Sequence, residues 1–258
     1  MIRIEKLWYH YGIRWVLKDV NLHVDKGELI CLMGPNGMGK STLLGCIAGT
    51  LQPVKGQVVI DGLERSQSPG EDLEIRRRSY FMPDHPWLPG SRTGREFFEA
   101  VGSIYGVEKM RLREHSEKLI KLFNLEKKGE STIKSYSNGQ KKKLAVAGAL
   151  VSEAPILLLD EPFSGGMDPS AILALKKVMA WLADRDDITL IIASPVPEIV
   201  EHLAHRVAIM RRGELVACDT LEGLRRSTGC DGSLAEILEH IMHPRTRDHL
   251  RLYFEGED

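Results

Sequence analysis

The stretch Gly34-Pro-Asn-Gly-Met-Gly-Lys-Ser-Thr42 decides the fold of this chain. It fits the pattern G-x-x-x-x-G-K-[ST], in which glycines let the backbone curl so that several N–H groups face one phosphate group. An apolar run, Leu29–Met33, leads into the stretch, and a helix-like run, Thr42–Ala48, leads out of it. A helix that begins there directs the positive end of its dipole at the anion. The stretch therefore predicts a phosphate-binding loop between a buried strand and a helix.

All residues of this loop are candidate ligands of a nucleotide. They are Gly34, Pro35, Asn36, Gly37, Met38, Gly39, Lys40, Ser41 and Thr42. Lys40 supplies a mobile cation for the β- and γ-phosphates, and we expect it to take part in catalysis. Ser41 supplies a hydroxyl ligand for Mg²⁺. The loop therefore predicts that the cofactors are a nucleoside triphosphate and Mg²⁺.

A second motif, Ile156-Leu-Leu-Leu-Asp160-Glu161, is an apolar strand that ends in two carboxylates. An aspartate at a strand end beside a phosphate loop commonly holds Mg²⁺, so Asp160 is a candidate metal ligand together with Ser41. Glu161 then lies where it could polarise a water for attack on the γ-phosphate, so we expect it to be catalytic. The alternative for this motif alone is a strand that merely ends in polar residues.

Composition narrows the class of protein. The chain has 258 residues, of which 43% are hydrophobic and 28% charged, enough for one large domain or a core with a satellite subdomain. The formal net charge is −1, which gives no reason to expect nucleic acid as a partner. The short basic runs, Arg76–Arg78 and Lys141–Lys143 among them, are interpreted as solvated faces. Four cysteines without paired spacing favour reduced thiols in a cytosolic protein.

The order of apolar runs predicts an α/β fold with a mostly parallel core sheet, and the phosphate-loop motif makes it resemble a parallel-sheet core of the P-loop NTPase type. Buried parallel strands are expected at Leu29–Met33, Ile156–Leu159 and Ile188–Ala193. An N-terminal antiparallel β-subdomain is expected from strands at Ile2–Trp8, Val20–Val24 and Gln57–Ile60. Helices are expected at Thr93–Tyr105, at Met110–Asn124 and after Asp168-Pro169. The helix-rich block at about 84–150 is interpreted as a helical subdomain inserted in the core.

From about residue 2 to residue 220, the chain resembles the nucleotide-binding subunit of an ATP-binding cassette (ABC) transporter. Besides the two motifs above, Tyr136-Ser137-Asn138-Gly139-Gln140 resembles the family signature L-S-G-G-Q. The resemblance implies that Ser137, Asn138, Gly139 and Gln140 meet the ATP held by an opposite subunit, at the start of a helix. Taken alone, Ser137 could be a plain helix cap.

The resemblance assigns two further residues. Tyr11 matches the aromatic residue that stacks on adenine in the family, although Trp8, Tyr9 and Trp15 are rivals for that place. Asp168 resembles the aspartate that crosses the dimer interface. The expected domain division is an ABC ATPase domain at 1–230, followed by a C-terminal helix and charged tail at 231–258.

Two departures from the family pattern bear on hydrolysis. Asp84 stands where the family has a glutamine that contacts Mg²⁺ and the attacking water; it is a weak site candidate, and unpaired it would repel phosphate. Pro195 stands where the family has a histidine that bonds the γ-phosphate, and proline has no donor. His202 and His205 lie too far along the chain to substitute. These departures predict hydrolysis at a low rate.

The resemblance implies an ATPase that powers a membrane permease on a separate chain, and Thr93-Gly-Arg-Glu96 is similar to an export-type subgroup. A second ABC subunit, identical or different, would complete a dimer on the cytoplasmic face of the membrane. We further hypothesise that Phe97 and Phe98 form an exposed surface for a permease helix. The alternatives are a regulatory module with little hydrolysis and a soluble ABC ATPase without a transport role.

Overall fold

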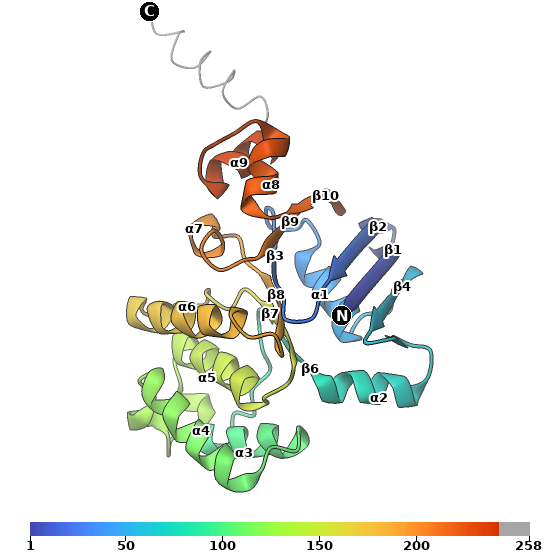
Figure 1. The fold of residues 1–258 in the computed structure, drawn as a ribbon. Coiled ribbons are helices and arrows are strands. Elements are labelled where there is room, and N and C mark those ends of the chain that lie inside the picture. Colours follow the sequence, from blue (N-terminus) through green and yellow to red (C-terminus); the bar gives the residue numbers. More distant parts are fainter. Residues whose placement is uncertain (243–258) are drawn as a thin grey trace, which may run out of the picture.

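The structure is a computed structural model that describes residues 1–242, so the charged part of the expected C-terminal tail lies outside the described residues. It is an α/β fold of two sheets and a helical segment, as the sequence predicts (Figure 1). No helix in this part of the chain is long and apolar enough to cross a membrane.

The core sheet has six strands in the order β10-β9-β3-β8-β7-β6. Five of them are parallel, and β10 pairs antiparallel with β9 at one edge. Their bounds are β3 Leu29–Met33, β6 Ser79–Met82, β7 Ile156–Asp160, β8 Thr189–Ala193, β9 Arg206–Arg211 and β10 Glu214–Asp219. Every residue of β3, β7 and β8 is buried, because both faces of the sheet are covered. The three expected parallel strands are confirmed.

The N-terminal sheet has four antiparallel strands in the order β2-β1-β4-β5. Their bounds are β1 Ile2–Tyr11, β2 Arg14–Val24, β4 Lys55–Ile60 and β5 Leu63–Glu64. Helix α1, Lys40–Ala48, lies between the two sheets and contacts β2 on one side and β6, β7 and β8 on the other. Eight of its nine residues are buried, so it has no solvent-facing stripe.

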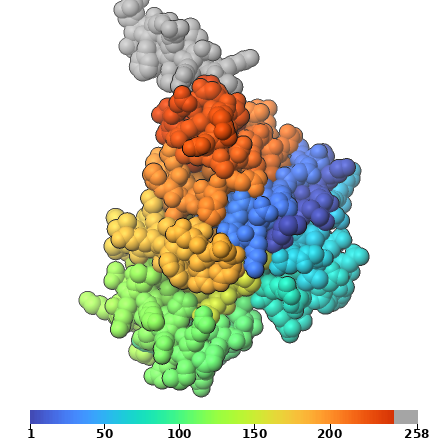
Figure 2. Space-filling view, viewed as in Figure 1, coloured from blue at the N-terminus to red at the C-terminus, as the bar shows by residue number. Residues whose placement is uncertain are grey.

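The helical segment forms one end of the molecule, away from the N-terminal sheet (Figures 1 and 2). It contains α3 Gly94–Ile104, α4 Lys109–Leu122, the 3₁₀ turns Glu126–Lys128 and Ile133–Ser135, and α5 Asn138–Val151. The remaining helices are α2 Pro69–Arg78, α6 Pro169–Ala183, α7 Pro197–Val200, α8 Leu221–Thr228 and α9 Leu234–Met242. The expected helices at 93–105, at 110–124 and after Pro169 are confirmed within two residues, whereas the domain boundaries stay a prediction.

The hypothesis of an exposed surface at Phe97 and Phe98 is wrong for Phe98. Phe98 is fully buried. The ring of Phe97 packs against α5, where a Cβ on Gly148 would lie 2.8 Å from it. Phe97 is half-buried, because α3 packs against both α4 and α5. The exposed aromatic residue in this region is Trp87, on the loop that follows Asp84.

Candidate functional site

The predicted phosphate loop lines a cleft of about 550 Å³ at the carboxyl ends of β3 and β7. The lining also comes from the tip of the β1–β2 hairpin and from the loops after β6 and β7. Its residues are Tyr11, Arg14, Val16, Asn36, Gly37, Gly39, Lys40, Ser41, Thr42, Asp84 and Glu161. Two other clefts are as large, about 600 and 610 Å³, but their linings contain none of the predicted site residues. The chemistry of the lining, rather than its volume, therefore identifies the candidate site.

The three loop residues outside this lining anchor the loop. Gly34 has φ 140°, and a Cβ there would lie 2.3 Å from the carbonyl oxygen of Met210 on β9, so only glycine fits. The sulfur of Met38 accepts a hydrogen bond from the backbone N–H of Arg212 at 3.1 Å. The carbonyl oxygen of Pro35 faces the ammonium of Lys40 at 3.2 Å. The loop is thus fixed against β9 before α1 begins at Lys40.

Lys40 holds the only side-chain ammonium in the cleft lining. Its Nζ donates to the carbonyl oxygen of Gly34 at 2.7 Å, and the residue is 5% exposed. Burial lowers the pKa of Lys40, while the carboxylates of Glu161 and Asp160 act in the opposite direction. The loop cation and the two strand-end carboxylates therefore lie within electrostatic reach of one another, as the sequence predicts for a phosphate and magnesium site.

Asp160, the last residue of β7, is 2% exposed. Burial raises the pKa of Asp160, and the nearby side-chain hydroxyl of Ser41 opposes that shift. Its Oδ1 has no hydrogen-bond partner among the described residues. A buried carboxylate oxygen without a partner, next to a hydroxyl, fits the ligands that Mg²⁺ prefers. Within residues 1–242, no cluster of three His, Cys, Asp or Glu could hold a metal, so Mg²⁺ here would complete its shell with phosphate and water oxygens.

Glu161 follows with a left-handed backbone, φ 48°, and its N–H donates to the carbonyl oxygen of Ala193 at 2.9 Å. A non-glycine residue in this region costs on the order of 1 kcal/mol, which the strand pairing around it must offset. Burial raises the pKa of Glu161, and the nearby carboxylate of Asp84 adds to that rise. The strained turn directs Glu161 into the cleft.

Asp84, which follows β6, is paired rather than free. Its Oδ1 accepts from Lys142 Nζ at 3.1 Å and from Ser164 Oγ at 3.2 Å. Lys142 and Lys143, on α5, are both buried, so the interpretation of the lysine run as a solvated face is wrong for these two residues. Their cost of burial is offset because each ammonium has an acidic partner.

The signature residues lie at the start of α5, outside the cleft of their own chain. Ser137 caps the helix through a capping box: its Oγ accepts from Gln140 N at 3.3 Å, and Gln140 Oε1 accepts from Ser137 N at 2.9 Å. Ser137 and Asn138 are exposed, whereas Gly139 is buried. A Cβ on Gly139 would lie 2.3 Å from the carbonyl oxygen of Gly166, so α5 docks directly on the loop after Glu161.

Asp168 ends that loop and caps α6, because its Oδ1 accepts from Ala171 N at 2.9 Å. Its other carboxylate oxygen forms an ion pair with Lys143. Hydrogen bonding to Lys143 lowers the pKa of Asp168. Lys142 and Lys143 therefore tie α5 to the loops after β6 and β7, an arrangement that sequence reasoning missed.

The histidines near Pro195 do not reach the cleft, as expected. His205 Nδ1 accepts from the N–H of Leu29 at 3.0 Å, at the end of β3 opposite to the phosphate loop. His202 is exposed. Neither histidine therefore replaces a donor at position 195.

The structure separates the four aromatic candidates. Tyr11 is 54% exposed and lines the cleft. Trp15 packs edge-on against Trp8, with ring centroids 5.4 Å apart, and Tyr9 packs on the buried core beneath the N-terminal sheet. Tyr11 is the one of the four that lines the cleft with the phosphate loop.

Comparisons with known proteins agree with this geometry. A family profile described as ABC transporter matches residues 17–164, more than half of the chain. The methionine import ATP-binding protein MetN of Vibrio vulnificus is 32% identical over 91% of this chain, which spans 64% of that relative. A MetN of Protochlamydia amoebophila is 32% identical over 94% of the chain, which spans 67% of it. The daunorubicin resistance ATP-binding protein DrrA3 of Streptomyces coeruleorubidus is 28% identical over 86% of the chain, which spans 68% of it.

Solved structures give the same result. The ATP-binding subunit of an ABC transporter superposes with a TM-score of 0.84 at 29% identity, covering 92% of this chain and 97% of the other. A dimeric, post-hydrolysis state of an ATP-binding cassette bound to ADP and Pi superposes with a TM-score of 0.76 at 25% identity, covering 86% and 99%.

Proposed function

This chain belongs to the ABC transporter family, and we propose that it binds MgATP in the cleft described above and hydrolyses it to drive a membrane permease. One observation carries the proposal. The phosphate loop, the strand-end carboxylates and an exposed tyrosine, which are far apart in the sequence, line one cleft or border it. A nucleotide needs these three elements for its phosphates, its metal and its base.

Within this proposal, each side chain has one task. The N–H groups of the loop and the ammonium of Lys40 hold the β- and γ-phosphates. Ser41 and Asp160 are the protein ligands of Mg²⁺, which when bound would neutralise phosphate charge. Glu161 orients a water and accepts its proton, a role favoured by its raised pKa. Tyr11 stacks on adenine.

The expectation of a low hydrolysis rate is not retained. It depended on an unpaired Asp84 and on the missing histidine at position 195, and the comparisons give it no support. Asp84 is paired with Lys142, so its charge is compensated. The regulatory and non-transport alternatives become outcomes of the experiments below.

Two such subunits would act as a dimer, either identical or different. The support is the exposure of Ser137 and Asn138 at the positive end of α5, where an anion from another chain could bind. The dimeric cassette among the similar structures supports it as well. In this arrangement Asp168 lies at the interface, and each ATP lies between the phosphate loop of one subunit and the signature of the other.

The permease partner and the direction of transport are further parts of the proposal. The permease would dock at the cytoplasmic face of the membrane, beside Asp84, where Trp87 is 84% exposed. We propose export, on the evidence of the Thr93–Glu96 stretch, which begins α3 with a capping box. The names of the relatives do not agree on the direction of transport, since MetN is an import protein by name and DrrA3 a resistance protein.

Phosphate release by the purified chain tests hydrolysis. We expect Glu161→Gln to lower the rate by on the order of a hundredfold or more, because the water loses its base, while MgATP affinity stays within about threefold. The control is Glu114→Gln on α4, an exposed residue with the same chemical change. A wild type that binds MgATP but releases no phosphate would favour the regulatory module.

The transport role has a separate test. Tagged chain is recovered from detergent-solubilised membranes of its source cells, and an integral membrane protein is expected to co-purify. Loss of that protein on Trp87→Glu, with phosphate release by the free chain unchanged, would support the docking face. Hydrolysis without any membrane partner would favour the soluble ABC ATPase.

A further inference from the structure

We propose that Lys142 is a positioning residue for the nucleotide site: it is the counter-ion that allows a triphosphate to approach Asp84. The inference rests on the proposed function, because it concerns the affinity of the cleft for ATP. It assigns a task to a lysine that the two motifs and the signature leave without one.

The ammonium of Lys142 has its three protons committed to acceptors at the site. Nζ donates to the carbonyl oxygen of Asp84 at 2.8 Å, to Asp84 Oδ1 at 3.1 Å and to the carbonyl oxygen of Asp160 at 3.4 Å. The Lys142 side chain is 4% exposed, so water cannot replace these partners. Lys142 thereby joins the loop after β6 to the end of β7.

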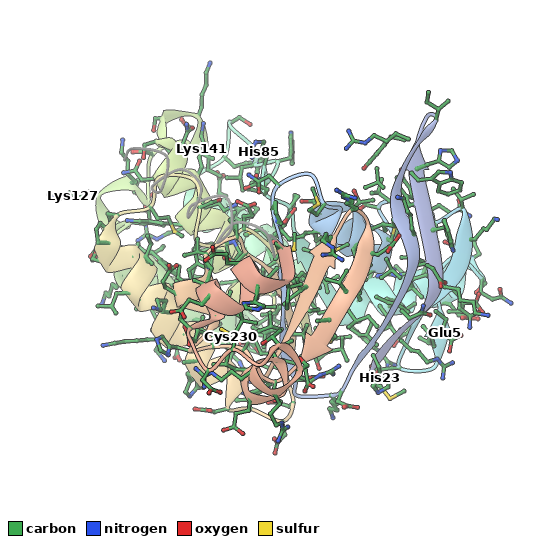
Figure 3. The ribbon with its side chains drawn as sticks, turned by 90° about the horizontal axis from the view of Figure 1, so that it is seen from above. Glu5, His23, His85, Lys127, Lys141 and Cys230 are labelled. Carbon is green, nitrogen blue, oxygen red and sulfur yellow. The ribbon has the colours of Figure 1, made fainter. Side chains whose placement is uncertain are left out.

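The side chain is held in this position from outside. Its stem passes under the loop after Glu161, where a Cβ on Gly165 would lie 3.3 Å from Lys142 Cγ. Figure 3 labels the two sequence neighbours of the pair, His85 and Lys141, which extend on the same side of the molecule. The close contact at Gly139 and the Lys143–Asp168 ion pair hold α5 against the neighbouring loops. The position of Lys142 beside Asp84 is therefore fixed.

Charge balance shows why the pair matters. Three carboxylates gather at this end of the cleft, those of Asp84, Asp160 and Glu161, and they act on one another. Two lysines face them, Lys40 and Lys142. Lys40 is needed by the phosphates, so Lys142 is the cation that compensates Asp84. Without it, Asp84 would keep a hydrogen bond from Ser164 Oγ and a contact with the exposed His85 ring, but no buried cation, and its charge would repel the γ-phosphate across a partly buried cleft.

Binding of Mg²⁺·AMP-PNP and of Mg²⁺·ADP to the full chain tests the proposal by titration calorimetry. We expect Lys142→Gln to weaken AMP-PNP on the order of tenfold, since the exposed charge of Asp84 repels the third phosphate, and ADP by no more than about twofold. Asp84→Asn should not weaken AMP-PNP. The double variant Asp84→Asn with Lys142→Gln should bind AMP-PNP within about threefold of the wild type.

Lys177→Gln, which removes an exposed lysine on α6, is the matched control. Thermal unfolding of each variant separates loss of fold from loss of affinity. Equal weakening of both nucleotides by Lys142→Gln, or failure of Asp84→Asn to restore AMP-PNP in the double variant, would overturn the counter-ion role and leave the proposed function intact. A wild type that binds neither nucleotide would overturn both.

Discussion

The phosphate loop and the first two turns of α5 are both parts of the proposed nucleotide machinery, but they are built in different ways. The loop is consecutive in sequence, and its anion site comes from backbone N–H groups and glycine conformations. The start of α5 acquires its partners through lysine side chains that reach residues 58 and 25 positions away. The phosphate loop can therefore be recognised from a local sequence motif, whereas the contacts of α5 form only when distant residues come together in the fold.

Replacing Lys40, the cation of the phosphate loop, should give the largest loss of MgATP affinity. A small loss would contradict the contrast between the phosphate loop and the start of α5. Lys40→Ala is expected to weaken MgATP by more than a hundredfold, on the order of 3–5 kcal/mol, because a buried charge partner of the phosphates is lost. Titration calorimetry measures it, with Lys177→Ala as the control. Unchanged affinity in a folded variant would show that the loop does not bind the phosphates.

The docking of α5 should respond to a single added methyl group. Gly139→Ala places a Cβ 2.3 Å from a backbone oxygen of the facing loop, and we expect it to lower the free energy of unfolding by about 2 kcal/mol. Urea unfolding provides the measurement. Asn138→Ala, one residue earlier and exposed, should change it by less than about 0.5 kcal/mol. Equal effects would mean that α5 is not held at this contact.

The end of the cleft that would bind adenine should contribute less to MgATP affinity than the end that would bind the phosphates. Tyr11→Ala is expected to weaken MgATP by about fivefold to a hundredfold, corresponding to the ~1–3 kcal/mol of an aromatic stack on a base. Tyr11→Phe keeps the ring and should bind like the wild type. If Trp15→Ala instead produced the loss, the wrong face of the hairpin would have been assigned to adenine.

The ion pair between Lys143 on α5 and Asp168 should make the smallest contribution to the free energy of unfolding, and that contribution should depend on pH. The folded pKa of Asp168 is lowered, so its contribution to stability is fully present above the unfolded pKa of about 3.9 and is lost as the pH falls through the lower folded pKa. Asp168 is half exposed, so we expect less than about 1 kcal/mol. Asp168→Asn, which can still cap α6, should therefore differ from wild type at pH 7, and the difference in urea unfolding should begin to shrink as the pH falls below about 4. A difference that stays the same from pH 7 down to pH 3 would assign the effect to the cap.

The sequence predicts the parallel core because its strands are short uniform apolar runs, such as Leu29–Met33. It does not reveal β6, β9 and β10. Strands β6 and β10 lie at the edges of the core sheet and are only partly buried, and β9 begins and ends with an arginine, so their patterns are mixed. The hairpin formed by β1 and β2 is also longer than expected. Arg14 and Val16, which line the cleft, were missed for that reason.

At the site, motif residues were predictable because their chemistry depends on local spacing. The pairing of Lys142 with Asp84 was not, because a run of lysines is typical of a solvated surface and nothing near residue 84 indicates its partner. The left-handed backbone of Glu161, directly after the last residue of β7 that pairs with β8, was equally hidden.

Helix α1 is enclosed by both sheets, and this placement has a consequence for how the protein comes apart. If either sheet separated from α1, buried apolar residues of the helix would be exposed and the helix would lose part of its packing against both sheets, so the two sheets should open as one cooperative unit in hydrogen exchange. The amino end of the same helix borders the cleft. A molecule that occupies the cleft would therefore slow opening of the N-terminal strands as much as that of the core strands.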